Sequence, residues 1–520
     1  MRSEPSVTRS RGRTRSPVAQ IIASVFAEGV EATLQRASRA AMAGADWVEL
    51  RLDRWPLDQD LAPLIGSIRL PVLVAIRTPE DGGSFRGTAQ ERRELFHRAL
   101  KAGAVGIDLE HWEQWTPSVG LARLRLMVRS FHSVTGVPKE LAMIQDRLCL
   151  WQGTVAKIVV TAHDLADAAP VMALMQATDQ RTRPTVAFAM GRTSWPTRIL
   201  AAACGAPFVY ASVEAGEETA PGQLPVSLCA GLYRVRELSA ATLLYGLLGN
   251  PALHSLGPVL HNRVFRRFGL DALYLPFETA RPEAVLAMLP RGRLRGMSVT
   301  APFKETLAGQ CHRLGAEAAA VGVVNTMAFE PHGLVVGHNT DIQGVLGALR
   351  SRGVMQVEPG SKNAVVLGTG GAARAAAFAL LRIGYAVTML GRSLDLALPF
   401  AQHHKVQLAA MTNDALVALR PAVVVNATPL GGAKPSGAAD PEERPVEGWT
   451  PEPGTAVLDM VYQPRMTRFL RDCEQAGAIA IPGAEMFLSQ ACAQAELFTG
   501  RRPSEEQLRS LLSGTAASSS

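Results

Sequence analysis

The chain has 520 residues, of which 47% are hydrophobic and 19% charged, and its formal net charge is +7. This length is too great for one hydrophobic core, and the composition is that of folded globular domains rather than of a disordered chain. Five arginines oppose one glutamate in the first sixteen residues, so the remainder is only weakly basic. That balance argues against a nucleic-acid-binding protein and suits an enzyme with anionic ligands.

The six cysteines form no CxxC pair and have no histidine nearby at metal-ligand spacing. They indicate reduced thiols in a cytoplasmic protein that holds no metal. No run of eighteen apolar residues is present, and no apolar signal core follows the N-terminal arginines, so we expect neither membrane insertion nor secretion. Residues 1–16 are expected to be a disordered basic tail, with a short organellar address as the alternative.

Short apolar segments recur through residues 17–232, with helical patterning between most of them. The eight segments are 21–25, 47–53, 72–78, 105–110, 124–130, 156–160, 185–190 and 208–213. This repeat predicts an α/β fold, specifically a (β/α)8 barrel over residues 17–232. An open doubly wound sheet is disfavoured because no glycine-rich fingerprint stands near the start.

Polar side chains stand at the ends of the barrel segments, where such barrels place their chemistry. These residues are Glu49, Arg51, Asp53, Arg77, Asp108 and Glu110, with His132 just after the fifth segment. Each alone is explained by a buried ion pair or a packing histidine. Their grouping at one end predicts an active site.

Lys157 lies inside the apolar run AKIVV of the sixth segment. Burial there lowers the pKa of an amine and leaves a nucleophile able to form an imine, whereas a lysine whose head reaches the rim is the alternative. His132, on the adjacent segment, supplies a base, and Arg198 and Gln223 are candidates to hold a carboxylate and hydroxyls. A lysine imine beside a histidine base predicts removal of a proton next to a ketone, followed by elimination.

These residues resemble the type I 3-dehydroquinate dehydratase family. The matching pieces are WVELRLD at Trp47, AIRT with a following DGG, SFHS with Pro138 beyond it, AKIVV and TAPGQ. The resemblance implies that Lys157 forms the imine and that His132 removes the adjacent proton and protonates the leaving hydroxyl. It also implies that the substrate is bound by Glu49, Arg51, Arg77, Arg198, Thr219 and Gln223. Asp81 is one methylene shorter than the family's usual acid and Thr219 replaces its serine, so we expect tuned affinity only.

Residues 233–242 are expected to be a linker, and residues 243–345 a second α/β domain. Two strand-like runs there are joined by Pro331-His332-Gly333, which predicts a hairpin. Lys304 and Asp341 each end an apolar run. They are either a proton-relay pair in a cleft or a surface salt bridge, and spacing alone favours the salt bridge.

Residues 346–485 are expected to form a Rossmann-like domain. An apolar run leads into Gly368-Thr369-Gly370-Gly371-Ala372-Ala373 and an alanine-rich helix, which is the form of a dinucleotide-binding turn. The next strand ends in Gly391-Arg392-Ser393 with no acid, which favours NADP over NAD. Residues 486–513 are expected to form a C-terminal helix that returns to the substrate domain, and residues 514–520 a frayed tail.

The second half is similar to shikimate dehydrogenases. The pieces in family order are GNPALHSLGPVLHN, SVTAPFK, VVNT, GHNTDIQG, GTGGAARA, NATPLG, DMVYQP and GAEMFLSQA. The resemblance implies proton exchange by Lys304 and Asp341, and substrate contacts from Ser255, Gly257, Thr300, Asn325, Tyr462 and Gln490. It implies that NADP(H) is held by Gly368, Gly370, Gly371, Ala372, Arg392, Ser393, Thr428 and Gly483.

Four positions depart from that family's pattern. Gly257 replaces the second serine of the HSxSP motif, Gly391 an asparagine, Leu396 a basic residue and Ser298 an asparagine. The changes at 391 and 396 weaken the preference for NADP without cancelling Arg392. The change at 257 removes a hydroxyl expected at the substrate carboxylate.

The sequence therefore predicts a bifunctional enzyme that dehydrates 3-dehydroquinate to 3-dehydroshikimate and reduces that product to shikimate. Its expected partners are these small molecules, with no nucleic acid and no membrane. The alternatives are a quinate dehydrogenase or gallate-forming activity in the second half, a non-catalytic sensor of quinate or dehydroquinate, and nucleic-acid binding through the arginine tail.

Overall fold

The computed structural model describes residues 18–117, 123–151, 153–354, 356–432, 440 and 442–513. It divides into two compact units. The first unit runs to Thr242 and includes Ala284–Pro290, and the second comprises Leu243–Glu283 and the chain from Arg291 onward. Residues 1–16 and 514–520, predicted as tails, lie outside the described residues.

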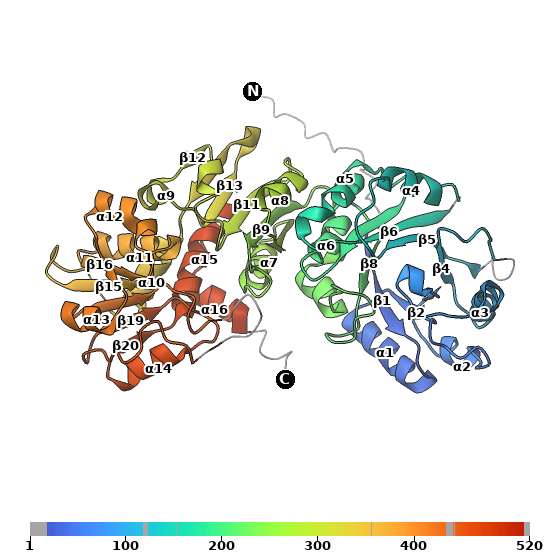
Figure 1. Cartoon of the computed structure of the whole chain (residues 1–520). Helices are drawn as coiled ribbons and strands as arrows, with labels where there is room; N and C mark the ends of the chain where they lie inside the picture. The colour runs from blue at the N-terminus through green and yellow to red at the C-terminus, as the bar shows by residue number, and fades with distance from the viewer. Residues whose placement is uncertain are drawn as a thin grey trace, which may run out of the picture. The chain divides into compact units, whose positions relative to one another are not determined.

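The first unit is built from eight parallel strands (Figure 1). They are β1 (Gln20–Phe26), β2 (Trp47–Arg51), β3 (Val72–Ala75), β4 (Gly106–Glu110), β5 (Leu126–Ser133), β6 (Thr154–Thr161), β7 (Thr185–Met190) and β8 (Phe208–Ala211). The main helices between them are α1 (Val30–Ala43), α2 (Ala62–Ile65), α3 (Ala89–Lys101), α4 (Leu141–Leu148), α5 (Ala169–Ala177) and α6 (Pro196–Ala203). The strand order β7-β6-β5-β4-β3-β2-β1-β8 brings the first and last strands together, so the predicted (β/α)8 barrel is confirmed as a nearly closed one.

The strand register decides which side chains share the barrel interior. Residues paired across parallel strands point to the same side of the sheet. Ser24 pairs with Glu49, and Ser130 pairs with Glu110 on one side and with Lys157 on the other, so the side chains within each pair point to the same side of the sheet. One expectation was wrong: β5 continues to Ser133, so His132 lies within the strand rather than after it.

The second unit begins with a six-stranded mixed sheet in the order β10-β9-β11-β13-β14-β12. Its strands are β9 (Leu243–Gly249), β10 (Ala272–Glu278), β11 (Leu294–Val299), β12 (Arg313–Leu314), β13 (Thr326–Phe329) and β14 (Val335–His338), with helices α7 (Gly257–Arg267) and α9 (Ala316–Val321). The helix α8 (Pro282–Met288) follows β10 in the chain, and most of it falls in the segment Ala284–Pro290 of the first unit. β13 and β14 are antiparallel and enclose the short helix Pro331–Gly333, so the predicted hairpin is confirmed.

The rest of the second unit is a parallel sheet in the order β17-β16-β15-β18-β19-β20. Its strands are β15 (Asn363–Leu367), β16 (Ala386–Gly391), β17 (Gln407–Ala410), β18 (Val423–Asn426), β19 (Ala456–Asp459) and β20 (Ile479–Ile481). Its helices are α10 (Asp341–Ser351), α11 (Gly371–Arg382), α12 (Leu398–His404), α13 (Asn413–Leu419) and α14 (Arg468–Gln475). This order is the 3-2-1-4-5-6 arrangement of Rossmann sheets, which confirms that expectation.

The chain then returns to the mixed sheet through α15 (Gly483–Thr499), and α16 (Glu505–Ser513) follows. α15 packs on α10 and against β11 and β13, and Tyr245 Oη donates to the Phe498 carbonyl at 2.9 Å. The helix thereby packs against the mixed sheet and α10 together.

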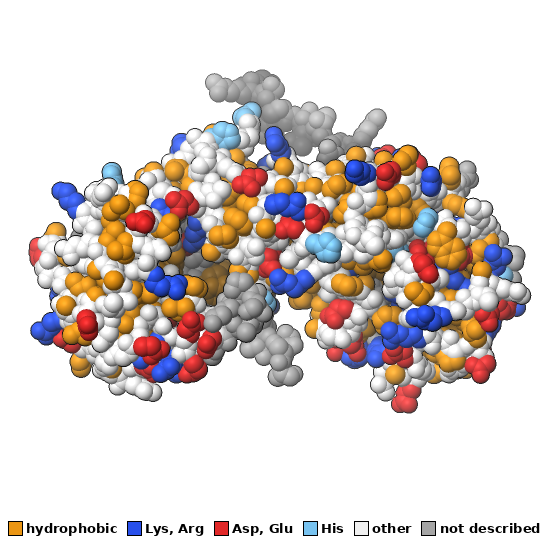
Figure 2. Space-filling view, viewed as in Figure 1, with side chains coloured by type: hydrophobic (Ala, Val, Ile, Leu, Met, Phe, Trp, Pro, Cys, Tyr) orange, Lys and Arg blue, Asp and Glu red, His pale blue; other side chains and the backbone are white. Residues whose placement is uncertain are grey.

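Charged side chains of both signs are interspersed on the face drawn in Figure 2, without a broad expanse of one sign. No helix in the described part of the chain combines the length and apolar character that a membrane span requires.

Candidate active sites

Lys157 lies at the centre of the polar cluster inside the barrel. Its side chain comes from β6 and the residue is only 4% exposed. The Nζ atom lies 3.0 Å from Asp108 Oδ2 and 3.6 Å from Glu49 Oε1. Burial lowers the pKa of Lys157, although Asp108 opposes that shift. The head therefore does not reach the rim, and the alternative of a snorkelling lysine is wrong.

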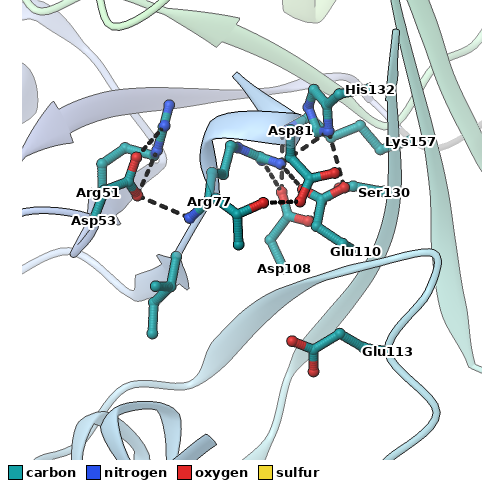
Figure 3. Close-up of polar contacts among 12 residues, drawn as sticks. Arg51, Asp53, Arg77, Asp81, Asp108, Glu110, Glu113, Ser130, His132 and Lys157 are labelled. Atoms are coloured by element: carbon teal, nitrogen blue, oxygen red, sulfur yellow. Dashed lines mark hydrogen bonds and ion pairs between the residues drawn. The ribbon is translucent and has the colours of Figure 1, made fainter. Parts of the chain in front are cut away.

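Arg77 holds the carboxylates of the cluster together (Figure 3). Its Nη2 donates to Asp108 Oδ2 at 2.7 Å and lies 3.8 Å from Glu49 Oε1, and its Nη1 donates to Glu110. Burial opposes the charge of Arg77, but Asp108 and Glu110 outweigh it and raise its pKa. A permanent cation is therefore shared by three acids, as buried acids require.

The two carboxylates of β4 differ in protonation. Burial opposes the charge of Asp108 as well, yet Arg77 and Lys157 hold its pKa below the ordinary value. Burial, with the charge of Asp108 close by, raises the pKa of Glu110 to about 7. Asp108 is thus the resident anion next to Lys157, while Glu110 exchanges a proton near neutrality.

His132 faces the same cluster from β5. Its Nδ1 lies 3.2 Å from Glu110 Oε2 and 3.0 Å from Arg77 Nη1. Burial and the charges of Arg77 and Lys157 lower its pKa well below 6.5, so the ring is neutral. Arg77 can only donate to Nδ1, whereas Glu110 can accept from it, so the two contacts belong to different tautomers. In the tautomer with Nδ1 donating to Glu110, Nε2 is left as a proton acceptor.

The remaining residues predicted for the first site occupy two other places. Arg51 pairs with Asp53, whose Oδ1 also accepts the Arg77 backbone N–H at 3.0 Å, and Figure 3 draws this pair apart from Lys157. Thr219 and Gln223 share the loop after β8, where Gln223 Oε1 accepts the Thr219 backbone N–H at 2.8 Å. Thr219 Oγ1 bonds to Ser24 Oγ at 2.8 Å, and Ser24 donates to Glu49, which ties this loop to the cluster.

Arg198 is a buried cation that no acid pairs with among the described residues. It lies on α6, is 3% exposed, and donates through Nη2 to the Pro221 carbonyl at 3.0 Å. No carboxylate pairs with it in the described part of the chain, and Nε has no hydrogen-bond partner there. Burial lowers its pKa to about 10. A buried charge is normally paired, and in the described part of the chain no acid pairs with this one.

Asp81, the shortened acid, is bonded to the side chains around it. Its Oδ2 accepts from Thr78 Oγ1 at 2.9 Å and from Trp112 Nε1 at 3.2 Å, and burial raises its pKa. Neither contact depends on the substrate, so Asp81 shapes the wall beside His132.

A cavity of about 500 Å³ in the second unit gathers most residues predicted for the second site. Its lining includes Ser255, Gly257, Thr300, Lys304, Asn325, Asp341, Tyr462 and Gln490, together with Ala372, Thr428 and Gly483.

Lys304 and Asp341 are in contact in this cavity. Lys304 Nζ bonds to Asp341 Oδ2, and Asn325 Nδ2 donates to the other oxygen at 2.8 Å. Their side chains are 17% and 8% exposed, so the surface salt bridge that spacing favoured is wrong. Asp341 opens α10, where the helix N-terminus stabilises its negative charge.

Sequence reasoning missed the polar floor of this cavity. Tyr274 Oη donates to Ser298 Oγ at 2.7 Å, and Ser298 in turn bonds to Gln494 at 3.1 Å. His261 stacks on Tyr274 with ring centroids 4.6 Å apart, and burial lowers its pKa to about 4. A signal existed for Gln494, because it stands one helical turn after Gln490 on α15.

Gly257 lies beside this floor. A Cβ atom there would stand 3.2 Å from Ser255 Oγ and 3.5 Å from Tyr274 Oη. Ser255 Oγ accepts the Gly257 backbone N–H at 3.1 Å. The missing side chain therefore leaves two neighbouring hydroxyls facing the cavity.

The turn predicted to bind a dinucleotide lies between β15 and α11. Gly368 has φ +115°, which favours glycine, and a Cβ atom on Gly370 would meet nothing within 4 Å. Gly371 opens α11, so the helix N-terminus faces the open space beside Gly370. Arg392 and Ser393 follow β16; Arg392 is exposed, with no ion pair or hydrogen bond in the described part of the chain.

Close packing explains why glycine stands at two further positions, because a side chain there would collide with its neighbours. A Cβ atom on Gly391 would stand 2.4 Å from Thr369 Cγ2, and one on Gly483 would stand 2.4 Å from the Val461 carbonyl oxygen. The departure at Gly391 thus fits the close approach of the turn, where Thr369 Oγ1 donates to the Ser393 carbonyl at 2.9 Å.

The fold and the two sites define an α/β enzyme with a buried lysine among carboxylates in a barrel and, in its second unit, a lysine–aspartate pair in a cavity and a glycine-rich turn between β15 and α11. Residues 21–240 match the family model of type I 3-dehydroquinase, and residues 247–327 match that of the shikimate dehydrogenase substrate binding domain. A chloroplastic bifunctional 3-dehydroquinate dehydratase/shikimate dehydrogenase from Arabidopsis thaliana is 30% identical over 502 residues, covering 92% of this chain and 82% of the relative. The chain belongs to the family of bifunctional 3-dehydroquinate dehydratases/shikimate dehydrogenases.

Two further comparisons concern the second unit. A shikimate dehydrogenase (NADP(+)) from Natronomonas pharaonis is 39% identical over 281 residues, covering 52% of this chain and 99% of the relative. A crystal structure of shikimate 5-dehydrogenase from Thermus thermophilus with NADP(H) and shikimate is 33% identical, with a TM-score of 0.45, and covers 52% of this chain and 99% of that one.

Proposed function

We propose that the first unit dehydrates 3-dehydroquinate to 3-dehydroshikimate through an imine on Lys157, and that the second unit reduces this product to shikimate with NADPH. The observation that carries the proposal is the position of Lys157: a buried amine of lowered pKa, 3.0 Å from Asp108, on the strand next to neutral His132. An imine-forming lysine requires this combination of a dry site and a nearby base.

The chain's groups account for each step of the dehydration. The Lys157 ammonium passes one proton to a neighbouring carboxylate and attacks the ketone carbon as an amine. That proton and a second nitrogen proton then leave with the ketone oxygen as one water, and Asp108 balances the charge of the protonated imine that remains. His132 Nε2 takes a proton from the carbon next to the imine, and the same proton then leaves with the hydroxyl as a second water. Hydrolysis consumes one water and frees the amine, so the net change is the loss of one water.

Arg198 fits the substrate's carboxylate. It is buried, has no acidic partner among the described residues, and lies on α6 beside the loop that carries Thr219 and Gln223. A bidentate guanidinium–carboxylate pair would restore the compensation that the free site lacks. Glu49, Arg77, Thr219 and Gln223 are then left to bind ring hydroxyls.

Lys304 and Asp341 serve the second site. Lys304 donates a proton to the ketone oxygen, and Asp341, fixed by Asn325, holds the ammonium toward the cavity. Ser255, Gln490, Thr300 and Tyr462 line the same cavity and supply hydroxyl and amide groups for the carboxylate and ring.

The residues present also fit NADP(H). The open space at Gly370, the positive φ of Gly368 and the N-terminus of α11 suit a pyrophosphate, and the unpaired Arg392 with Ser393 suits a 2′-phosphate. NADPH bound there supplies the hydride. Thr428, Ala372 and Gly483 border the cavity on the side of this turn.

Borohydride trapping tests the first site. Reduction in the presence of dehydroquinate should add the mass of the reduced substrate to the peptide that carries Lys157. Lys157→Ala should abolish the adduct, and Lys139→Ala, which alters a lysine outside the barrel strands, should not. An unmodified wild-type Lys157 would overturn the imine mechanism.

Cofactor choice tests the second site. Shikimate oxidation with NADP and with NAD should show an NADP preference that Arg392→Ala lowers by about 10-fold or more, as loss of a charge-assisted phosphate contact implies. The same variant should leave dehydration unchanged. An equal effect on both cofactors would contradict the assignment of Arg392.

Two of the alternative functions, the non-catalytic sensor and the quinate dehydrogenase, have less support. A sensor without catalysis would not need both lysines placed against carboxylates in buried sites. The quinate hypothesis rested on the hydroxyl missing at Gly257, but the hydroxyls of Tyr274 and Ser255 stand beside that position.

We also propose that the protein works in the cytoplasm. All six cysteines are free thiols, which suits a reducing compartment. Fractionation of the source cells with an activity assay for shikimate oxidation tests this.

A further inference from the structure

Tyr210 is a buried aromatic residue of β8 that the mechanism above does not use. It pairs with Ile22 of β1, is 3% exposed, and its ring centroid lies 3.8 Å from Lys157 Nζ. Its hydroxyl has no hydrogen-bond partner in the described part of the chain. Burial raises the pKa of the phenol well above 10, so the ring is neutral and its face is electron-rich.

The other contacts of Nζ are the two carboxylates. Asp108 Oδ2 lies 3.0 Å away and Glu49 Oε1 3.6 Å away, and Arg77 forms ion pairs with the same two carboxylates. A lysine ammonium has three N–H bonds with which to use both carboxylates. A protonated imine has one N–H, so it keeps at most one of these hydrogen bonds.

The charge on nitrogen is the same before and after imine formation. An ammonium and a ketone give a protonated imine and one water: the C–N bond forms, the C–O bond breaks, and two protons of the ammonium leave in the water. The positive charge therefore remains at Nζ while its hydrogen bonds decrease. A contact that needs no N–H bond, such as the face of an aromatic ring, therefore supplies a larger share of the stabilisation of the protonated imine than of the ammonium.

We propose that Tyr210 is a further catalytic residue of the dehydratase, whose ring face stabilises the positive charge of the imine on Lys157. This inference rests on the proposed imine mechanism. A cation over an aromatic face is attracted by the ring quadrupole, and the attraction is largest where water is excluded. The ring and the hydroxyl make separable contributions, because only the ring contacts Nζ.

Substitution separates the two contributions. Tyr210→Phe keeps the ring face and should leave kcat for dehydration within about 3-fold of wild type, whereas Tyr210→Leu fills the space without a π-face and should lower kcat about 10-fold. The fraction of enzyme trapped by borohydride at saturating dehydroquinate should fall with Tyr210→Leu. The urea transition of the first unit reports whether each variant is folded.

Ring fluorination gives the decisive measurement. Phenylalanines with one, two and three fluorines at position 210 keep the shape of the ring but progressively weaken its negative face. The logarithm of kcat should fall steadily along this series. Phe208 is the matched control, because it lies two residues earlier on β8, is also buried, and faces the same side of the sheet. The same series at 208 should leave kcat unchanged.

The outcomes distinguish this inference from the mechanism on which it rests. A flat response at position 210, in an enzyme whose Lys157 is trapped normally, overturns the role of Tyr210 alone. Equal slopes at 210 and 208 also overturn it, since the effect is then one of packing. Failure to trap wild-type Lys157 overturns the imine mechanism and this inference together.

Discussion

Lys157 Nζ lies 3.0 Å from Asp108 Oδ2, and Arg77 Nη2 lies 2.7 Å from the same oxygen. One buried carboxylate oxygen therefore faces two cations. Because Glu110 has a raised pKa, Asp108 is the β4 acid that keeps its charge at neutral pH.

Asp108→Asn should destabilise the first unit strongly. The change leaves Arg77 and Lys157 undercompensated in a buried site, which costs about 3–5 kcal/mol for a broken buried pair. Urea denaturation should show this loss in the first unit's transition, with shikimate oxidation retained at low urea. Asp146→Asn breaks the exposed pair with Arg183 and should cost about 1 kcal/mol or less. Similar losses in both variants would contradict the expected role of Asp108.

Arg39→Gln should weaken binding of dehydroquinate. Arg39, on α1, lies 2.7 Å from Glu214 and 2.6 Å from Glu217, and both glutamates precede Thr219 in the loop after β8. Loss of these two ion pairs should make the loop after β8 more mobile. KM for dehydroquinate should rise about 5-fold with little change in kcat, as expected for an ion-pair contribution of about 1 kcal/mol.

Arg183→Gln is the matched control for Arg39, since the two side chains are 38% and 35% exposed. It should leave KM unchanged. Added salt screens exposed charges, so it should raise KM of the wild type more than that of Arg39→Gln. A salt response that is the same in both proteins would show that the ion pairs of Arg39 do not act on the loop.

Much of the first site could be predicted because the strand register determines which side chains lie together inside the barrel. Once Glu49, Asp108 and Lys157 are placed on parallel strands, the barrel brings them to one interior. The strand pattern in the sequence could not predict which cation pairs with which acid in the cluster. Arg51 follows the same pattern as Arg77, yet it pairs with Asp53, two residues along its own strand end.

The second site shows a different limit. ALYLPFE is a continuous buried strand, and nothing in its pattern distinguishes Tyr274 from its apolar neighbours. Its contact with Ser298 depends on β9 standing between β10 and β11 in the sheet, a long-range order that a local pattern does not contain. The proximity of Lys304 and Asp341 has the same origin, which is why their spacing favoured a surface pair.

Gly257→Ser should tighten binding of shikimate. The backbone at this position has no positive φ, and the nearest obstacle to a Cβ atom is the tip of Ser255, 3.2 Å away, which can rotate. The added hydroxyl enters the cavity beside Ser255 and Tyr274. One net hydrogen bond contributes about 0.5–1.5 kcal/mol, so KM should fall about 2- to 10-fold.

Gly309→Ser is the control for Gly257, because a Cβ atom there meets nothing within 4 Å and the position is exposed. It should leave KM for shikimate unchanged, and neither variant should alter dehydration. A rise in KM with Gly257→Ser would show that the space at 257 is occupied by the substrate itself.

Asp459→Asn should change how stability responds to pH. Asp459 is buried at the end of β19 and accepts hydrogen bonds from Asn426 (2.9 Å), Val461 N (3.1 Å) and Thr467 (2.6 Å), but it pairs with no cation in the described part of the chain. Burial raises its pKa from 3.8 to about 6. The folded state therefore binds this proton more tightly than the unfolded chain, so the stabilisation is complete below about pH 4 and is lost as pH rises through about 6.

The difference between these two pKa values corresponds to about 3 kcal/mol. An asparagine keeps the shape and has no proton to lose, so the free energy of unfolding of wild type minus that of Asp459→Asn should fall by about 3 kcal/mol between about pH 4 and pH 7. Urea denaturation of both proteins across this range measures it, and the subtraction removes every other titrating group. A constant difference for Asp459→Asn would mean that Asp459 keeps its ordinary pKa in the folded protein.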